Sequence, residues 1–324
     1  MQKKWRPNPT WALISKLAYG DQRKYYLYNF IDLLIVDKAG QVSPEIAAGA
    51  FSLARKSVVV GDIYQIEPVW GVNRALAQSC GAIQRPDEFE RLERTGLNCS
   101  SSSAMKVAAK CCKYEKFGEK GMLLREHRRC YDEIIQYCNE LVYRGNLLPL
   151  RGKGSEDSNL PIKHWPQMGY RQIDTEHSTR KGNSRINPRE AEQIAAWLKS
   201  HVKLIVDAYP KEAKENLVGV ITPFKAQVAC IREKLKEHLP NDQSKTSVGT
   251  VHTFQGAERR IIILSTVYGK QDGCYFIDLN KSLMNVAVSR AKDHFFVFGD
   301  IHCLKDTTSS ASGLLKKHLI GNEI

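Results

Sequence analysis

The chain has 324 residues, of which 42% are hydrophobic and 26% charged, values typical of a folded protein with a sizeable core and about two domains. Its net charge of +13 favours a polyanionic partner, either nucleic acid or nucleotide. No apolar run is long enough to span a membrane, the first residues lack the apolar core of a secretion signal, and the nine cysteines contain no Cys-x₂-Cys pair. These features argue against a membrane protein, a secreted protein and a zinc ribbon. They predict free thiols in the cytoplasm, nucleoid or nucleus.

The first 30 residues are basic and rich in tryptophan and tyrosine, and they follow no clean period. Basic residues among aromatic ones can stack on bases and clamp a single strand. The same composition also fits the remnant of a domain whose beginning is missing, and both interpretations stay open.

The next stretch predicts a strand, a helix and a second strand. Its strands are short β-branched runs that end on Asp37 and Asp62, as buried parallel strands do when they deliver carboxylates to the carboxyl edge of a sheet. Between them, Ser43-Pro44 predicts the start of a helix, so the sheet is expected to be parallel. At such an edge an aspartate can hold Mg²⁺, and Gln65 can sense a γ-phosphate.

The rest of the chain alternates predicted helices and buried strands. Residues 71–120 predict helices and loops outside the sheet, and the Gly- and Ser-rich stretch 151–160 predicts a linker. Helical periodicity predicts helices over 131–142, 187–205, 225–238 and 283–291. Continuous apolar runs predict strands over 217–221, 261–264 and 295–298. This alternation indicates a second parallel α/β unit.

Four further motifs carry candidate functional residues. They are Leu124–Arg128, which ends an apolar run on cations; Ile221–Gln227, where a strand exits into a helix; Val248–Glu258, a loop before a buried strand; and Asn285–Lys292, which is expected to place Arg290 on a short helix. Each motif is weak alone, and their order along the chain is the informative feature.

In this order the motifs resemble those of a superfamily 1 helicase, of the branch that includes the nonsense-mediated-decay helicase and the Okazaki-fragment nuclease-helicase. The resemblance covers about residues 31–300. Asp37 matches the family's Walker B aspartate, and Asp62 with Gln65 matches its Gly-Asp-x-x-Gln element. The family's Gln-Tyr-Arg element resembles Glu126-His127-Arg128, in which only the arginine is kept. The Phe-Gln-Gly-x-Glu element and the Asn-Val-Ala-x-[Ser/Thr]-Arg-Ala element are intact.

The resemblance implies roles for the residues of the second half. Arg128 and Arg290 would neutralise charge on the transferring phosphoryl group, an effect worth about 10³–10⁵ in rate. Gly256 and Glu258 would bind the nucleotide, with Glu258 accepting a hydrogen bond from the ribose. Gln227 would couple the nucleotide to the nucleic acid.

In the first half the resemblance implies that Asp37 binds Mg²⁺, that Asp62 contributes to nucleotide binding and that Gln65 reads the γ-phosphate. The sequence departs from the family at Lys38, where the family has the glutamate that deprotonates the attacking water. A lysine ammonium, with an ordinary pKa of about 10.4, cannot accept that proton. The chain also contains no Gly-x-x-x-x-Gly-Lys-[Ser/Thr], the Walker A loop that cradles phosphates. We therefore expect a segment carrying Walker A upstream of this chain.

The expected fold is α/β, with two RecA-like parallel-sheet domains of the P-loop NTPase type at residues 1–120 and 121–324, the first incomplete at its N-terminus. The expected function is that of the C-terminal portion of an ATP-dependent helicase or translocase on single-stranded DNA or RNA, with ATP and Mg²⁺ bound between the domains. The alternative is a catalytically inactive nucleic-acid-binding or regulatory module, which Lys38 and the absent Walker A sequence favour. Whether the chain is an enzyme stays open.

Overall fold

The computed structural model describes residues 28–73, 75–77, 79, 86–240 and 246–324. It divides into two compact units, with the boundary between Leu123 and Leu124. The basic, aromatic segment predicted at the N-terminus lies outside the described residues, apart from its last three positions.

The first unit is built on a parallel pair of strands, β1 (Ile31–Val36) and β2 (Ala54–Val59), joined by helix α2 (Pro44–Ser52). This confirms the predicted strand, helix and strand. A second helix, α5 (Ala104–Cys111), packs beside α2 through small side chains, which lets the backbones approach closely. The unit also contains α4 (Pro86–Thr95) and the short hairpin of β3 (Glu115–Lys116) and β4 (Glu119–Lys120).

The expectation that these two strands are buried is wrong. Leu33 is 51% exposed, Ile35 65% and Val58 47%. Within the described part of the chain no third strand pairs with β1 or β2, and the small cluster formed with α2 and α5 covers only part of the pair. The apolar composition of the strands therefore reports their type and direction but not their burial in this chain.

The second unit contains a five-stranded parallel sheet, which confirms the predicted α/β class. Its strand order is β11 (Thr246–Gly249), β10 (Val218–Ile221), β12 (Arg259–Ser265), β13 (Ala291–Gly299) and β7 (Met168–Gln172). Every neighbouring pair runs parallel. The amino ends of all five strands therefore lie at one edge of the sheet and their carboxyl ends at the opposite edge.

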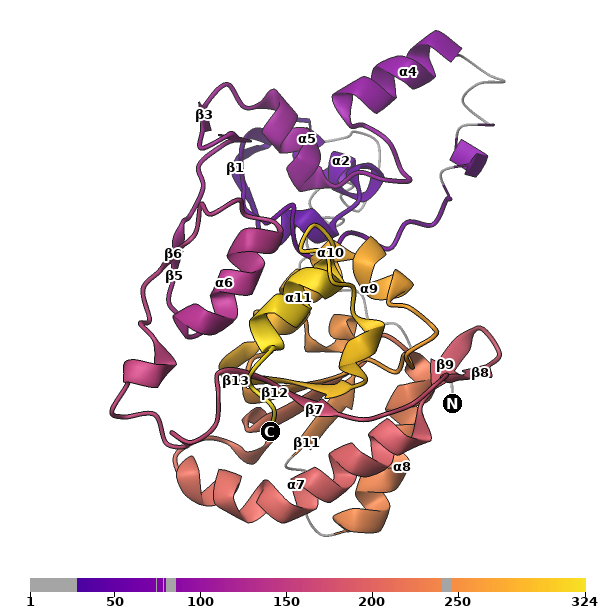
Figure 1. The fold of residues 1–324 in the computed structure, drawn as a ribbon. Coiled ribbons are helices and arrows are strands. Elements are labelled where there is room, and N and C mark those ends of the chain that lie inside the picture. The colour runs from indigo at the N-terminus through magenta and orange to yellow at the C-terminus, as the bar shows by residue number, and fades with distance from the viewer. Residues whose placement is uncertain (1–27, 74, 78, 80–85, 241–245) are drawn as a thin grey trace. The chain divides into compact units, whose positions relative to one another are not determined.

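Helices cover both faces of this sheet (Figure 1). On one face lie α7 (Pro188–Ala208) and α8 (Lys225–His238), whose apolar sides form the main core with β10, β12 and β13. On the other lie α6 (Asp132–Leu141), α10 (Lys281–Val288) and α11 (Ala311–Leu319), preceded by the short α9 (Tyr275–Leu279). The start of α7 is capped as predicted, because the Asn187 side chain accepts a hydrogen bond from Glu190 N.

Three features differ from the sequence prediction. Residues 151–160 form an ordered loop of the second unit, not a linker, because Tyr131 Oη donates a 2.7 Å hydrogen bond to Asp157 and Leu160 is buried. Strand β7 was not predicted, since its sequence, MGYRQ, is short and mixed. Helix α10 ends at Val288, so Arg290 lies in the turn before β13 and not on a helix.

Two small strand pairs complete the second unit. The first joins β5 (Glu126–His127) to β6 (Leu148–Pro149), and the second is a hairpin of β8 (Thr179–Lys181) and β9 (Ser184–Ile186). Among the helices of the described ranges, none is both long enough and apolar enough to cross a lipid bilayer.

Candidate functional site

In the first unit, Asp37 and Asp62 follow the ends of β1 and β2 and so lie at one edge of the parallel pair. The backbones are in contact there, because Ala39 N donates a 2.9 Å hydrogen bond to Val60 O. Asp62 accepts hydrogen bonds from Tyr64 N at 2.8 Å and from Gln65 Nε2 at 3.1 Å. The predicted γ-phosphate sensor is therefore held by the predicted nucleotide-binding aspartate.

Lys38 lies beside Asp37. Its backbone adopts φ 55° and ψ 35°, in the left-handed region, and its N–H donates a 2.8 Å hydrogen bond to Asp37 Oδ1. Its ammonium Nζ lies 3.9 Å from Asp37 Oδ2, and both side chains are well exposed. A cation thus neighbours the carboxylate expected to hold a metal ion.

The residues present fit Mg²⁺ in a limited way. Within the described residues, no group of three or more His, Cys, Asp or Glu side chains is arranged to hold a metal ion. Mg²⁺ is commonly bound through one or two carboxylates, with phosphate oxygens and waters completing its shell. The exposed carboxylate of Asp37 fits that single-ligand role, in competition with the Lys38 ammonium.

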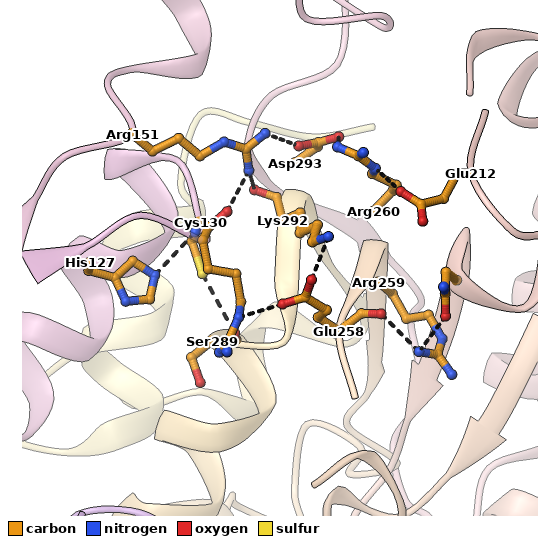
Figure 2. A network of polar contacts seen from close by, with 12 residues as sticks. His127, Cys130, Arg151, Glu212, Glu258, Arg259, Arg260, Ser289, Lys292 and Asp293 are labelled. Carbon is orange, nitrogen blue, oxygen red and sulfur yellow. Dashed lines mark hydrogen bonds and ion pairs between the residues drawn. The ribbon is translucent and has the colours of Figure 1, made fainter. Parts of the chain in front are cut away.

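In the second unit, Glu258 directly precedes β12 and Arg290 directly precedes β13. Because these strands are paired and parallel, both residues lie at the amino edge of the sheet. Figure 2 shows Glu258 between Lys292 and the surrounding polar network. Lys292 Nζ lies 2.5 Å from Glu258 Oε1, and Arg129 Nε lies 2.7 Å from Oε2. Partial burial raises the pKa of Glu258, but the two cations outweigh it and hold the pKa below its usual value.

Arg290 is 4% exposed. Its Nε donates a 3.3 Å hydrogen bond to Val286 O, and its Nη2 donates one of 3.3 Å to Ser289 Oγ. Within the described residues no ion pair joins Arg290 to a carboxylate. Burial lowers the pKa of its guanidinium, and the positive charge of nearby Arg129 lowers it further. The guanidinium is thus a buried cation beside Glu258 that keeps donor capacity for an anion.

The structure separates the two arginines that end the LREHRR run. Arg128 is 69% exposed at its side chain and pairs with Glu126 at 2.9 Å, away from Glu258. Arg129, which the sequence prediction did not select, contacts Glu258 and also donates to Ser289 O at 3.4 Å. The cationic run signalled a site, but its spacing could not tell which arginine turns inward.

Two neighbouring groups are kept uncharged. Burial, helped by Arg129, Arg290 and Arg151, lowers the pKa of His127 to about 4, and its Nε2 accepts a 3.1 Å hydrogen bond from Cys130 N. Burial raises the pKa of the Cys130 thiol to about 12. Neither group therefore adds charge to this edge at neutral pH.

A second set of ion pairs supports the same edge (Figure 2). Asp293, on β13, is bound by Arg151 and by Arg260, which lies 3.4 Å away, and Arg260 in turn pairs with Glu212 at 2.7 Å. The Arg151 guanidinium also lies 3.7 Å from the centre of the Tyr131 ring. This network ties the amino ends of β12 and β13 to the loop after β6, which carries Arg151, and to Tyr131 at the start of α6.

Gln227 lies at the other edge of the sheet. It is fully buried at the start of α8, where its Nε2 donates to Asn187 O and Ser265 Oγ, each at 3.1 Å, and its Oε1 accepts from Asn187 N at 2.8 Å. Ser265 ends β12, whereas Glu258 precedes that strand, so about 20 Å separates the two ends. Gln227 therefore orients backbone and does not join the Glu258 cluster.

Gly256 lies in the turn before Glu258, with φ +79° and open space where a Cβ would stand. The turn is what glycine permits, and it brings the chain from the short helix at Val251–Phe254 into β12.

Comparison with known proteins decides the family. A family model described as "AAA domain" matches residues 102–302. The chain is 29% identical over 287 residues to the human "RNA helicase Mov10l1", covering 84% of this chain and 22% of that protein. It is 26% identical over 316 residues to the "DNA replication ATP-dependent helicase/nuclease dna2" of Schizosaccharomyces pombe, covering 88% of this chain and 20% of that protein. The chain belongs to the superfamily 1 helicases.

A further curated relative is also named as a helicase. The chain is 33% identical over 191 residues to the mouse "5'-3' DNA helicase ZGRF1", covering 58% of this chain and 10% of that protein. Among solved structures, this chain is similar to the arterivirus nonstructural protein 10 (helicase), with a TM-score of 0.37 and 12% identity. The match covers 82% of this chain and 38% of that one. The matched part of this chain thus corresponds to between 10% and 22% of the length of these curated relatives.

Proposed function

We propose that the chain forms part of an ATP-driven helicase or translocase on single-stranded nucleic acid, with ATP and Mg²⁺ bound between two RecA-like domains. The observation that carries the proposal is the amino-edge cluster of the second unit. There, Glu258 is fixed by Lys292 and Arg129 beside the buried Arg290, which has no carboxylate partner in the described chain. A fixed carboxylate suits a ribose hydroxyl, and a buried cation with spare donors suits a phosphoryl group.

In this proposal each residue has one task. Arg290 stabilises charge on the transferring phosphoryl group, and Glu258 accepts a hydrogen bond from the ribose. Asp37 is a Mg²⁺ ligand, and the ion neutralises phosphate charge when bound. Gln65, held on Asp62 by its 3.1 Å hydrogen bond, senses the γ-phosphate.

Three further residues take supporting tasks in the same proposal. Arg128 is exposed and pairs only with a neighbouring glutamate, so its contact with phosphate requires a turn of its side chain. Gly256 shapes the turn that presents Glu258. Gln227 couples the nucleotide to nucleic acid indirectly, by fixing the starts of α7 and α8. Work on nucleic acid places the protein in the cytoplasm, nucleus or nucleoid.

A second candidate is favoured by Lys38. Its ammonium lies beside Asp37 and cannot deprotonate water, and loss of a general base costs about 10²–10⁴ in rate. A protein with this residue can hold nucleic acid, and even nucleotide, with little turnover. This second candidate is a non-catalytic nucleic-acid-binding or regulatory module.

One pair of measurements separates the two. Fluorescence anisotropy with labelled single-stranded DNA and RNA reports binding. ATP turnover is measured, with and without the nucleic acid, in a longer form of the protein that carries a Walker A loop. A motor gives strand-stimulated turnover that Arg290→Ala lowers while strand binding persists. Binding without stimulated turnover supports the non-catalytic module, and absence of binding to either strand contradicts both candidates.

A further inference from the structure

The β8–β9 hairpin of the second unit lies in a basic segment of the sequence. Residues 179–189 contain four cationic side chains and no carboxylate. Arg180, Lys181, Gly182 and Asn183 at its tip are exposed. The backbones of Arg180 and Lys181 pair with β9, but within the described residues neither of their side chains makes a hydrogen bond or an ion pair. Two exposed cations thus lie at a turn, and no carboxylate among the described residues pairs with them.

The base of this hairpin is fixed by Asp272, from the loop after β12. Asp272 accepts hydrogen bonds from Ser178 N at 2.6 Å, Gly269 N at 3.0 Å and Arg185 Nη1 at 2.8 Å. Burial raises the pKa of Asp272, but these donors outweigh it and lower the pKa to about 2. The carboxylate therefore stays ionised and keeps Arg185 at the base, so the cations at the tip are carried on an ordered support.

Two neighbouring elements lie against the hairpin. Ser184 Oγ accepts a 3.2 Å hydrogen bond from Ala226 N, in the first turn of α8. Lys270 N donates a 2.8 Å hydrogen bond to Thr175 O, in the segment that leads into β8. Each element brings an exposed cation, Lys225 at the start of α8 and Lys270 itself, and neither forms an ion pair within the described part of the chain.

The carboxylates at the base of the hairpin are already engaged. Asp272 is bound as described, Glu176 accepts a 2.8 Å hydrogen bond from Gln271 Nε2, and Asp174 accepts one of 2.6 Å from Gln172 Nε2. His177 also faces Asp272, at 3.8 Å. The base therefore pairs its cations with Asp272, whereas no ion pair of the described residues includes a cation of the tip.

From this arrangement we infer that the β8–β9 hairpin is a phosphodiester-binding element, which contacts the backbone of a single-stranded nucleic acid through Arg180 and Lys181, with Lys225 and Lys270 beside it. The inference rests on the proposed function. It deepens that function by naming an element that contacts the nucleic acid and lies outside the family motifs. Phosphate contacts from such side chains position a strand without reading its sequence. An ordered support lowers the entropy lost when the cations engage phosphates.

The test compares two double variants of equal charge. Arg180→Gln/Lys181→Gln removes two positive charges from the hairpin, and Lys199→Gln/Lys203→Gln removes two exposed positive charges from α7. Affinity for labelled oligo(dT) and oligo(U) is measured by anisotropy from 50 to 300 mM salt, a range chosen around the ~0.15 M physiological value. Each lost phosphate contact should reduce the slope of log K against log salt by about 0.7.

For both oligonucleotides, we expect the slope of log K against log salt to become shallower by about 1.4 in the hairpin variant. The α7 variant should keep the slope of the parent. Circular dichroism confirms that both variants are folded. Equal slopes in the two variants, or a hairpin variant that binds like the parent, would overturn the inference while leaving the proposed function intact. If the parent binds neither oligonucleotide, the proposed function itself fails. A hairpin variant that loses affinity for poly-glutamate but not for the oligonucleotides would assign the hairpin to an acidic protein and overturn the inference.

Discussion

Arg129 Nε lies 2.7 Å from Glu258 Oε2, an ion pair between residues 129 positions apart in the sequence. It joins the segment before α6 to the turn before β12, at the edge where Lys292 holds the other oxygen of the same carboxylate. Both partners are more than a third exposed, so the pair orients Glu258 more than it stabilises the fold.

The first prediction concerns this pair. Arg129→Gln should lower the free energy of unfolding by less than about 1 kcal/mol, because solvent screens the pair and Lys292 still holds Glu258. The measurement is urea unfolding at pH 7, with Arg128→Gln as the matched control, since Arg128 pairs only with the exposed Glu126. If Arg129→Gln lowered the free energy of unfolding by several kcal/mol, the ion pair would stabilise the fold far more than its solvent exposure indicates.

The second prediction concerns the buried carboxyl of Glu190, which accepts hydrogen bonds from Ser265 Oγ at 2.6 Å and Val267 N at 2.9 Å. Burial raises its pKa to about 8, and the donors only partly offset that rise. Between pH of about 4.5 and 8 the folded state holds a proton that the unfolded state releases, so the free energy of unfolding should fall as pH rises.

Glu190→Gln removes this titration. Its unfolding free energy should therefore fall less steeply than that of the parent between pH 5 and 8, by up to about 1.4 kcal/mol per pH unit. Urea unfolding at four pH values measures the slope, and Glu233→Gln, an exposed position on α8, is the control that should keep the parental slope. Parallel pH profiles for the parent and Glu190→Gln would show that Glu190 is already ionised in the folded protein.

The third prediction concerns two glycines of the first unit. A Cβ on Gly40 would lie 2.5 Å from Asp62 O, and this backbone atom cannot move without displacing the chain after β2. Gly40→Ala should therefore destabilise the first unit by about 1–3 kcal/mol. A Cβ on Gly49, in α2, meets no atom within 4 Å, so Gly49→Ala should stabilise the helix by about 0.5–1 kcal/mol.

Thermal unfolding of both alanine variants measures the difference. The two substitutions add the same methyl group to the same unit, so opposite signs can come only from the surroundings. Similar melting temperatures for both would mean that the chain after β2 yields to the added methyl at little cost.

The fourth prediction concerns Lys38. In any longer form of the protein that carries a Walker A loop, Lys38→Glu should raise strand-stimulated ATP turnover by at least about tenfold, because it supplies a general base. Lys38→Gln is the control, since it removes the charge beside Asp37 without adding a base. If the lysine form already turns over as fast as the glutamate form, the family role assigned to position 38 is wrong.

Local pattern was sufficient to predict much of the fold. The β-branched runs before Asp37 and Asp62, and the helix between them, gave the direction of the first sheet, and Asn187 marked the start of α7. The burial of β1 could not be predicted, because it depends on what packs against the strand. Strand β7 was missed because five mixed residues at a sheet edge carry almost no period.

The candidate site was predicted in part for similar reasons. Motif order located Glu258 and Arg290, but it could not place them at the edge of the sheet opposite Gln227, which requires the strand directions. Arg129 and Lys292 follow motif residues by one or two positions in the sequence. Which cation of a run turns inward depends on three-dimensional neighbours, and no spacing rule reports that choice.

Strand β12 has a mechanical consequence. It is hydrogen-bonded to β10 on one side and β13 on the other, and a strand bonded on both sides resists stretching. A ligand that pulled Glu258 along the strand axis would load Ser265 and, through it, the buried amide of Gln227 at the far end. The register of β12 against β13 is irregular between Arg259 and Ile261, close to the end of the strand that Glu258 precedes. We expect this break in the hydrogen-bond ladder to take up a small displacement of Glu258, so that only a larger one would reach Gln227.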